Sequence, residues 1–169
     1  MDDFSIRTEQ PDDAVSIGEL LEAAFGQPDE RILVEQLREQ GLFEISLVTL
    51  AETKIIGFVL FSRIEVETRT KRTEVLSLAP LAVHPDHQRK GIGAELVIAG
   101  IEAAKKSEFP GIFVLGDTHY YQRFGFSSEL GAKFTSPFPI PEFMAIDLDD
   151  HFSKLLGGNV VYSKPFGIK

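Results

Sequence analysis

The chain of 169 residues contains no cysteine, so disulfide bonds, thiolate nucleophiles and cysteine-ligated metal sites are excluded together. It also lacks any apolar run near the roughly 20 residues that a membrane-spanning helix needs. The first ten residues are acidic and contain no hydrophobic segment of the kind found in secretory signals. These absences predict a cytoplasmic protein that does not enter a membrane.

Several catalytic and ligand-binding motifs are missing as well. There is no GxxxxGK[ST] phosphate loop and no G-x-S-x-G nucleophile elbow, and Leu96 stands where the dinucleotide fingerprint needs its third glycine. His84 and His87 have no carboxylate or cysteine partners at metal-ligand spacing. We therefore predict no metal site, no Ser-His-Asp hydrolase and no Rossmann-type cofactor site.

The composition is that of a folded globular protein, with 43% hydrophobic and 25% charged residues. At this length we expect one domain that spans residues 1–169. The formal net charge of −9 disfavours binding to nucleic acid and to anionic membranes, and favours cationic small molecules or basic peptide termini. An acidic surface that serves solubility alone is the preferred explanation of the charge.

The most informative stretch, residues 78–104, is predicted to form a strand, a tight loop and a helix. Apolar residues run up to Val83, and the segment His84–Asp86 stops the strand because proline cannot extend a ladder. A basic loop and the sequence Gly91–Gly93 then lead directly into an apolar helix. Free N–H groups at a helix start favour an anion, most often a phosphate.

This loop, QRKGIG, resembles the [QR]-x-x-G-x-[GA] signature of the GNAT superfamily of acyl-CoA-dependent N-acyltransferases. The resemblance implies acetyl-CoA as cosubstrate, with its pyrophosphate held by the loop and the first turn of the helix. The residues so implied are Gln88, Arg89, Lys90, Gly91, Ile92, Gly93 and Ala94.

Pro80 interrupts the strand before the loop. Proline has no N–H for a ladder, so a bulge, a separation from the neighbouring strand, or an edge position is expected there. In the GNAT fold such a bulge parts two parallel strands, and main-chain groups beside it pair with the pantetheine amides. By position the resemblance assigns these groups to Leu81, Ala82 and Val83.

A second motif, GDTHYYQRFGF, covers Gly116–Phe126 and resembles the family's Y-x-x-[LF]-G-F segment, in wording close to a bacterial subgroup of uncharacterised predicted acetyltransferases. The resemblance places Tyr121 beside the acyl-transfer centre. A phenol is protonated at neutral pH and can donate its proton to the departing sulfur, so Tyr121 is the catalytic candidate. Packing against the cofactor without proton transfer is the alternative role.

The acceptor amine must lose a proton, and Glu74, Glu35 and His119 are all candidates for the base. None is singled out by the sequence. A small-molecule amine and a peptide or protein amine both remain open as the acceptor.

The remaining periodicity fits the same fold class, an α/β (α+β) protein with a mixed, splayed sheet of about seven strands flanked by helices. Helical spacing over residues 11–41 predicts two acceptor-side helices, and residues 74–126 form the predicted acyl-CoA-binding core. Near-alternation over residues 42–50 and 55–66 predicts a hairpin. The proline-rich segment 135–141 is either a rigid linker or one wall of the acceptor pocket.

The C-terminal part, residues 142–169, begins with a strand predicted over residues 143–148. The resemblance to the GNAT fold implies that this strand pairs antiparallel with Ile112–Leu115. The last residues of the C-terminal part carry enough apolar side chains to dock on the body of the protein or on a second copy in a homodimer. The sequence as a whole predicts an N-acetyltransferase that passes the acetyl group of acetyl-CoA to a primary amine. The alternatives are a non-catalytic acyl-CoA-binding sensor or partner module, and transfer of a longer acyl group.

Overall fold

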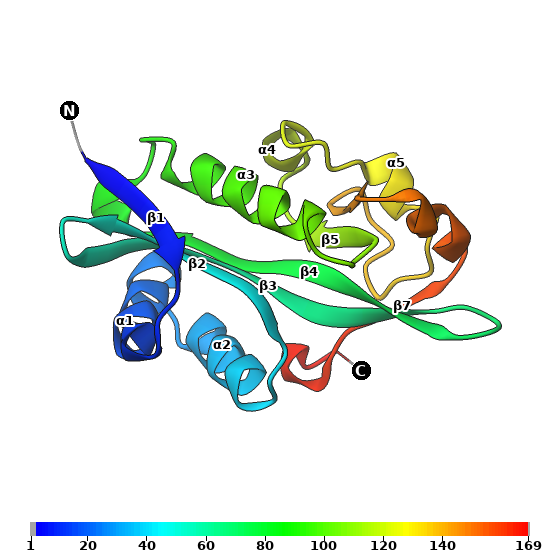
Figure 1. The fold of residues 1–169 in the computed structure, drawn as a ribbon, viewed down its shortest axis with the longest axis horizontal. Coiled ribbons are helices and arrows are strands. Elements are labelled where there is room, and N and C mark those ends of the chain that lie inside the picture. Colours follow the sequence, from blue (N-terminus) through cyan, green and yellow to red (C-terminus); the bar gives the residue numbers. More distant parts are fainter. Residues whose placement is uncertain (1–2, 169) are drawn as a thin grey trace. The chain divides into compact units, whose positions relative to one another are not determined.

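The computed structural model describes residues 3–168 (Figure 1). Its contacts divide the chain into two compact units. The first unit contains the residues up to Phe61 together with Ala79–Ala103, and the second contains Ser62–Leu78 together with the residues from Ala104 onward. A single domain spanning 1–169 remains a prediction.

The strands are connected in the order β1-β2-β3-β4-β5-β6, and β7 pairs with β3, which makes a mixed seven-stranded sheet. This confirms the predicted fold class. The strands β3 (Lys54–Glu67) and β4 (Arg72–Val83) contribute residues to both units. β3 also has the longest run of buried residues among the strands of residues 3–168, as expected for the centre of a sheet.

The first unit holds the strands β1 (Phe4–Thr8) and β2 (Phe43–Ala51), which pair antiparallel, with Phe4 opposite Ala51. Helices α1 (Ala14–Phe25) and α2 (Asp29–Glu39) lie on one side of these strands, and α3 (Ile92–Lys105) lies on the other (Figure 1). The two predicted helices within residues 11–41 are therefore present. A 3₁₀ turn, Pro11–Asp13, precedes the first of them.

Two glycines let α3 pack closely on β3 in the first unit. A Cβ added at Gly57 would lie 2.9 Å from a methyl carbon of Ile92, and one at Gly100 would lie 2.1 Å from the ring of Phe61. Any larger residue at Gly100 would push the helix away from the strand. This contact fixes the position of the helix whose first turn follows the basic loop.

The second unit holds β5 (Gly111–Leu115), which is parallel to β4, and β6 (Phe143–Asp147), which is antiparallel to β5. The short strand β7 (Asn159–Val161) pairs with the end of β3. Two short helices, α4 (Thr118–Gln122) and α5 (Ser128–Gly131), lie between β5 and β6 in sequence. The predicted antiparallel pairing of residues 143–148 with β5 is confirmed.

The core of the second unit is built on phenylalanine. The ring of Phe113 stacks on Phe143 at 5.3 Å between centroids and meets the edge of Phe134 at 5.0 Å. Phe152 and Val160 from the C-terminal segment are buried in the same cluster. The C-terminal segment therefore docks on the body of the protein, one of the two predicted positions.

One extra residue lies in β4 relative to β3. The N–H of Thr68 bonds to the carbonyl of Lys71, and the N–H of His84 bonds to the carbonyl of Ile56. From one bond to the other, the chain runs twelve residues on the β3 side, from Ile56 to Thr68, and thirteen residues on the β4 side, from Lys71 to His84. β4 therefore contains a bulge, in agreement with the expectation drawn from Pro80, which is buried in this stretch.

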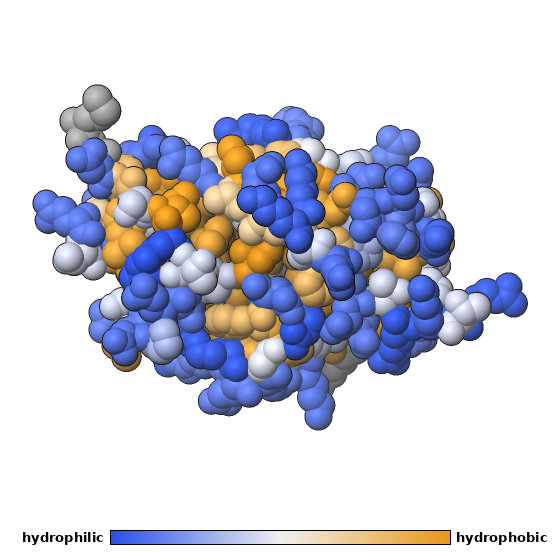
Figure 2. Space-filling model, in the orientation of Figure 1, coloured by the Kyte–Doolittle hydropathy of each residue, from blue (hydrophilic) through white to orange (hydrophobic). Residues whose placement is uncertain are grey.

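The face of the protein in Figure 2 carries hydrophilic side chains with apolar side chains visible between them. Among the exposed apolar residues are Val15 on α1 and Ile98 on α3. No helix within residues 3–168 is long and apolar enough to cross a membrane.

Candidate functional site

The loop between β4 and α3 has a backbone that only certain residues adopt easily. Arg89 and Gly91 both have positive φ values, +64° and +82°. A Cβ added at Gly91 would meet nothing within 4 Å, so the glycine serves the backbone conformation and keeps the space beside the loop open. Alternation of left-handed and ordinary residues makes a concave run of N–H groups that suits an anion.

Helix α3 adds its own N–H groups to this loop. The N–H of Glu95 makes a helical bond to the carbonyl of Gly91 at 3.0 Å, so the N–H groups of the preceding helical residues, Ile92–Ala94, have no acceptor within the helix. The positive end of the helix dipole lies at the same place. The loop and the first turn together form an anion-binding cradle, which fits a diphosphate group.

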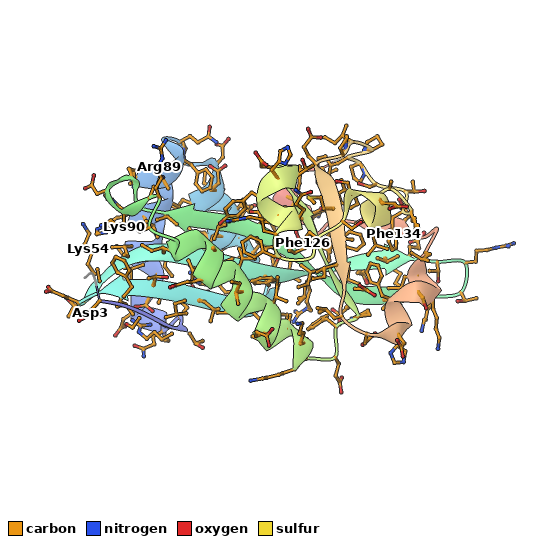
Figure 3. The ribbon with its side chains drawn as sticks, turned by 90° about the horizontal axis from the view of Figure 1, so that it is seen from above. Asp3, Lys54, Arg89, Lys90, Phe126 and Phe134 are labelled. Carbon is orange, nitrogen blue, oxygen red and sulfur yellow. The ribbon has the colours of Figure 1, made fainter. Side chains whose placement is uncertain are left out.

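Two hydrogen bonds hold the ends of the loop. The side-chain amide of Gln88 donates to the carbonyl of Val83 at 3.1 Å, and the N–H of His84 donates to Ile56 on β3 at 2.8 Å. Arg89 and Lys90 are exposed residues of this loop (Figure 3), and Nζ of Lys90 lies 5.8 Å from the centroid of the Phe4 ring. They supply positive charge at the edge of the cradle.

The strand residues assigned to the pantetheine, Leu81, Ala82 and Val83, are the last three residues of β4. Ala82 is buried, whereas the other two are partly exposed. The carbonyl of Val83 already accepts the Gln88 bond, so one of its two lone pairs is engaged. The first unit thus brings together all ten predicted cofactor-binding residues on one continuous segment.

The predicted catalytic residue, Tyr121, lies on α4 in the second unit. The side chain of Asp117 caps this helix by accepting from the N–H of Tyr120 at 3.0 Å, and Gly125 ends the motif with a φ of +101°. The Tyr121 ring meets the edge of Phe126 at 5.8 Å and that of Tyr120 at 5.0 Å. Figure 3 shows Phe126 directly after α4.

Gly116, at the end of β5, is a supporting residue that the sequence did not reveal. A Cβ there would lie 2.5 Å from Cε2 of Tyr121, so only glycine leaves room for the ring. The glycine precedes the Asp117 cap, and that Gly-Asp pair is the signal that could have indicated it. The N–H of Gly116 also donates to the carbonyl of Glu142 at 3.0 Å.

The phenol of Tyr121 keeps its proton at neutral pH. Burial, and secondly the neighbouring phenol of Tyr120, raise the pKa of Tyr121 to about 12. Within residues 3–168, the Tyr121 hydroxyl has no hydrogen-bond partner. The O–H is therefore free to donate to a bound molecule.

The three base candidates are not brought together. Glu74 pairs with Arg63 at 3.2 Å, and Glu35 pairs with Arg31 at 2.9 Å. His119 is exposed on α4. The structure singles out none of them as the base.

Within residues 3–168 no group of three or more His, Asp or Glu side chains could hold a metal ion. The rings of His84 and His87 have centroids 6.0 Å apart, and Nδ1 of His84 accepts from the N–H of Asp86 at 3.1 Å. Hydrogen bonding within the loop thus occupies this histidine nitrogen.

The model of the acetyltransferase (GNAT) family matches residues 14–126. The chain belongs to this family. It is therefore an acyl-CoA-dependent acyltransferase, as its two motifs predicted. The matched region contains both the anion-binding loop and the Tyr121 segment.

Two curated GNAT relatives are uncharacterised N-acetyltransferases of Escherichia coli. YjhQ is 37% identical over 142 residues, which cover 82% of this chain and 78% of YjhQ. YhbS is 36% identical over 122 residues, which cover 72% of each chain.

Solved structures of GNAT proteins have the same fold. The structure of E. coli YhbS in complex with CoA matches with a TM-score of 0.88 and 30% identity, over 99% of this chain and 93% of that chain. A GNAT acetyltransferase from Brucella melitensis in complex with acetyl-CoA matches with a TM-score of 0.80 and 27% identity, over 98% and 99%.

Proposed function

We propose that this GNAT protein is an N-acetyltransferase that transfers the acetyl group of acetyl-CoA to the primary amine of a small-molecule, peptide or protein acceptor. The observation that carries the proposal is the loop at the start of α3, where positive φ values at Arg89 and Gly91 and the N–H groups of Ile92–Ala94 form a cradle suited to a diphosphate. CoA and acetyl-CoA in the two solved relatives support the choice of cosubstrate.

In this proposal the first unit binds the cosubstrate. The N–H groups of Gly91–Ala94 hold the pyrophosphate, with Gln88, Arg89 and Lys90 at its edge. Main-chain groups of Leu81, Ala82 and Val83 pair with the pantetheine amides. A main-chain N–H of the same strand donates to the thioester carbonyl oxygen, where negative charge develops.

Bound acetyl-CoA supplies a thioester whose C–S bond breaks as the amine nitrogen bonds its carbonyl carbon, so the sulfur gains a proton and the amine loses one. Tyr121 donates a proton to the sulfur, since its phenol is protonated at neutral pH. Gly116 and Phe126 fix the direction of the ring. Water takes up the proton that the amine loses and returns one proton to the phenolate of Tyr121.

The test is thiol release from acetyl-CoA in the presence of pooled primary amines, for the wild type, Tyr121→Phe and the matched control Tyr120→Phe. The protein itself contributes no thiol, because it has no cysteine. We expect amine-dependent release that falls at least about tenfold in Tyr121→Phe only. Equal activity in all three proteins would remove Tyr121 from the mechanism.

Acetyl-CoA binding without release for any amine would contradict the enzymatic proposal. That result would favour a non-catalytic acyl-CoA-binding module. Calorimetric titration with acetyl-CoA distinguishes this outcome from a protein that has simply lost its fold.

A further inference from the structure

A pocket of about 480 Å³ lies in the second unit beside α5 and β6, in the size range of small-molecule sites. Its walls are mostly apolar: the lining includes Phe134 and Phe143, which are buried, and Ile140, which is 49% exposed. Figure 3 shows Phe134 on the segment that follows α5. The proline-rich segment, which the sequence left open as linker or pocket wall, forms one side of the pocket.

Contacts within the chain hold the walls of the pocket together. The hydroxyl of Ser128 donates to the carbonyl of Pro141, which ties α5 to the proline-rich segment. Gly131 lies against β6 so closely that a Cβ there would be 2.3 Å from the carbonyl oxygen of Phe143. Two prolines further restrict the backbone, so little ordering entropy opposes binding.

Two chain connections join the pocket to the surroundings of Tyr121. Pro141 in the pocket wall is followed by Glu142, whose carbonyl accepts from Gly116, the residue that makes room for the Tyr121 ring. On the other side, Ser128 in the wall follows two residues after Phe126, whose ring touches Tyr121. The pocket wall and the Tyr121 ring are therefore held by neighbouring residues of the same segments.

The charge of the pocket is carried by one residue. Glu129 is the single ionisable side chain in the lining, and it has no ion-pair partner within the described residues. A carboxylate at an apolar pocket attracts an amine and repels an acid. The apolar walls in turn favour the neutral form of an amine, which is the form that attacks a thioester.

We infer that this pocket receives the hydrocarbon body of the acceptor, and that the acceptor is a small primary alkylamine that carries an aromatic ring. The inference rests on the proposed acetylation of an amine and names its substrate class. Aromatic rings pack favourably against a phenylalanine-lined wall. A polyamine is disfavoured, because apolar walls do not solvate several charges.

The experiment compares 2-phenylethylamine, propylamine and spermidine as acceptors with saturating acetyl-CoA, and measures binding of 2-phenylethylamine by calorimetry. We expect kcat/KM to be highest for 2-phenylethylamine. Ala132→Phe fills the pocket from an exposed position in its lining and should raise the KM for 2-phenylethylamine at least about tenfold. Lys133→Phe, at the next residue outside the lining, is the matched control.

Glu129→Gln should raise the same KM about two- to fivefold at low salt, and the effect should disappear at high salt. Glu108→Gln, which replaces an exposed glutamate outside the pocket, should change nothing. Neither glutamate variant should alter the affinity for acetyl-CoA.

Acetylation of all three amines with equal efficiency, unaffected by Ala132→Phe, would overturn the pocket assignment and leave the proposed function intact. Binding of 2-phenylethylamine that Ala132→Phe abolishes, with no acetylation of any amine, would support the pocket and contradict the proposed function.

Discussion

The two regions assigned to this GNAT protein's chemistry differ in what builds them. The loop before α3 is made of main chain: its shape depends on positive φ values at Arg89 and Gly91, and its donors are N–H groups. The Tyr121 segment is made of side chains, with the phenol held between Gly116 and aromatic neighbours. Backbone sites depend on conformation, and side-chain sites depend on packing, so different substitutions should damage them.

The largest effect is expected where packing orients the reactive group. Gly116→Ala places a methyl carbon where it would lie 2.5 Å from the Tyr121 ring, so the ring must move. Misplacement of a catalytic group by about 1 Å costs up to about 100-fold in rate, and we expect kcat to fall about 10- to 100-fold. Steady-state kinetics and acetyl-CoA calorimetry on the same protein check this.

The matched control is Gly18→Ala, whose new methyl group meets the flexible side chain of Arg31 at 3.1 Å. It should leave kcat unchanged. A loss of acetyl-CoA affinity in Gly116→Ala equal to its loss of kcat would break the distinction between the two regions.

The next effect is on the backbone-built loop. Gly91→Ala keeps open space around the new methyl group but disfavours the φ of +82° by about 1–2 kcal/mol, which weakens acetyl-CoA binding by about tenfold. Calorimetry measures the dissociation constant. Gly26→Ala carries a similar conformational penalty at φ +70°, directly after the end of α1, and should lower stability without changing affinity. Equal affinities for both variants would show that the loop conformation does not matter for binding.

Alkaline pH should lower stability through the tyrosines, which include Tyr121. All three tyrosines lie in the second unit, and burial raises the pKa of Tyr121 to about 12. Burial also raises the pKa of Tyr162, although a hydrogen bond with Ser77 acts in the opposite direction. Both phenols are neutral in the folded and unfolded states below about pH 10, the pKa of an unfolded tyrosine. Above it the unfolded state ionises first, so stability falls as pH rises towards the folded-state pKa.

Thermal melts followed by circular dichroism between pH 8 and pH 11 measure how stability changes with pH. This range includes the ordinary tyrosine pKa of about 10. Tyr121→Phe and Tyr162→Phe should each flatten the decline above pH 10. A wild-type slope that neither substitution changes would contradict the assigned burial.

The smallest effect is expected from the exposed cations of the loop. Arg89→Gln should weaken acetyl-CoA binding about two- to fivefold at low salt, because exposed ion pairs contribute at most about 1 kcal/mol. Arg69→Gln removes an exposed arginine from the β3–β4 hairpin and should have no effect. A loss in Arg89→Gln that exceeds the loss in Gly91→Ala would mean that side-chain charge, not backbone shape, dominates the loop.

The same difference explains how much could be predicted from the sequence. Glycine spacing and a proline are visible in the sequence wherever the backbone must turn or leave a ladder, so the loop and the irregularity in β4 were predictable. Side-chain packing gives a weaker signal in the sequence. Neither the contact of Gly116 with Tyr121 nor the pocket beside α5 follows from residue types alone, because both depend on segments that meet only in the folded chain. The strand β7 was also missed, since three residues are too few for a periodic signal.

The most direct test of the account is an amide-resolved NMR titration of the wild-type protein with CoA. If one acyl-CoA molecule uses both regions, the N–H signals of Gly91, Gly93 and Ala94 should shift most, and signals of Tyr121–Gly125 should shift in the same titration with the same dissociation constant. Shifts confined to one of the two regions, or a loop whose N–H signals do not move, would contradict the assignment of both motifs to a single acyl-CoA site.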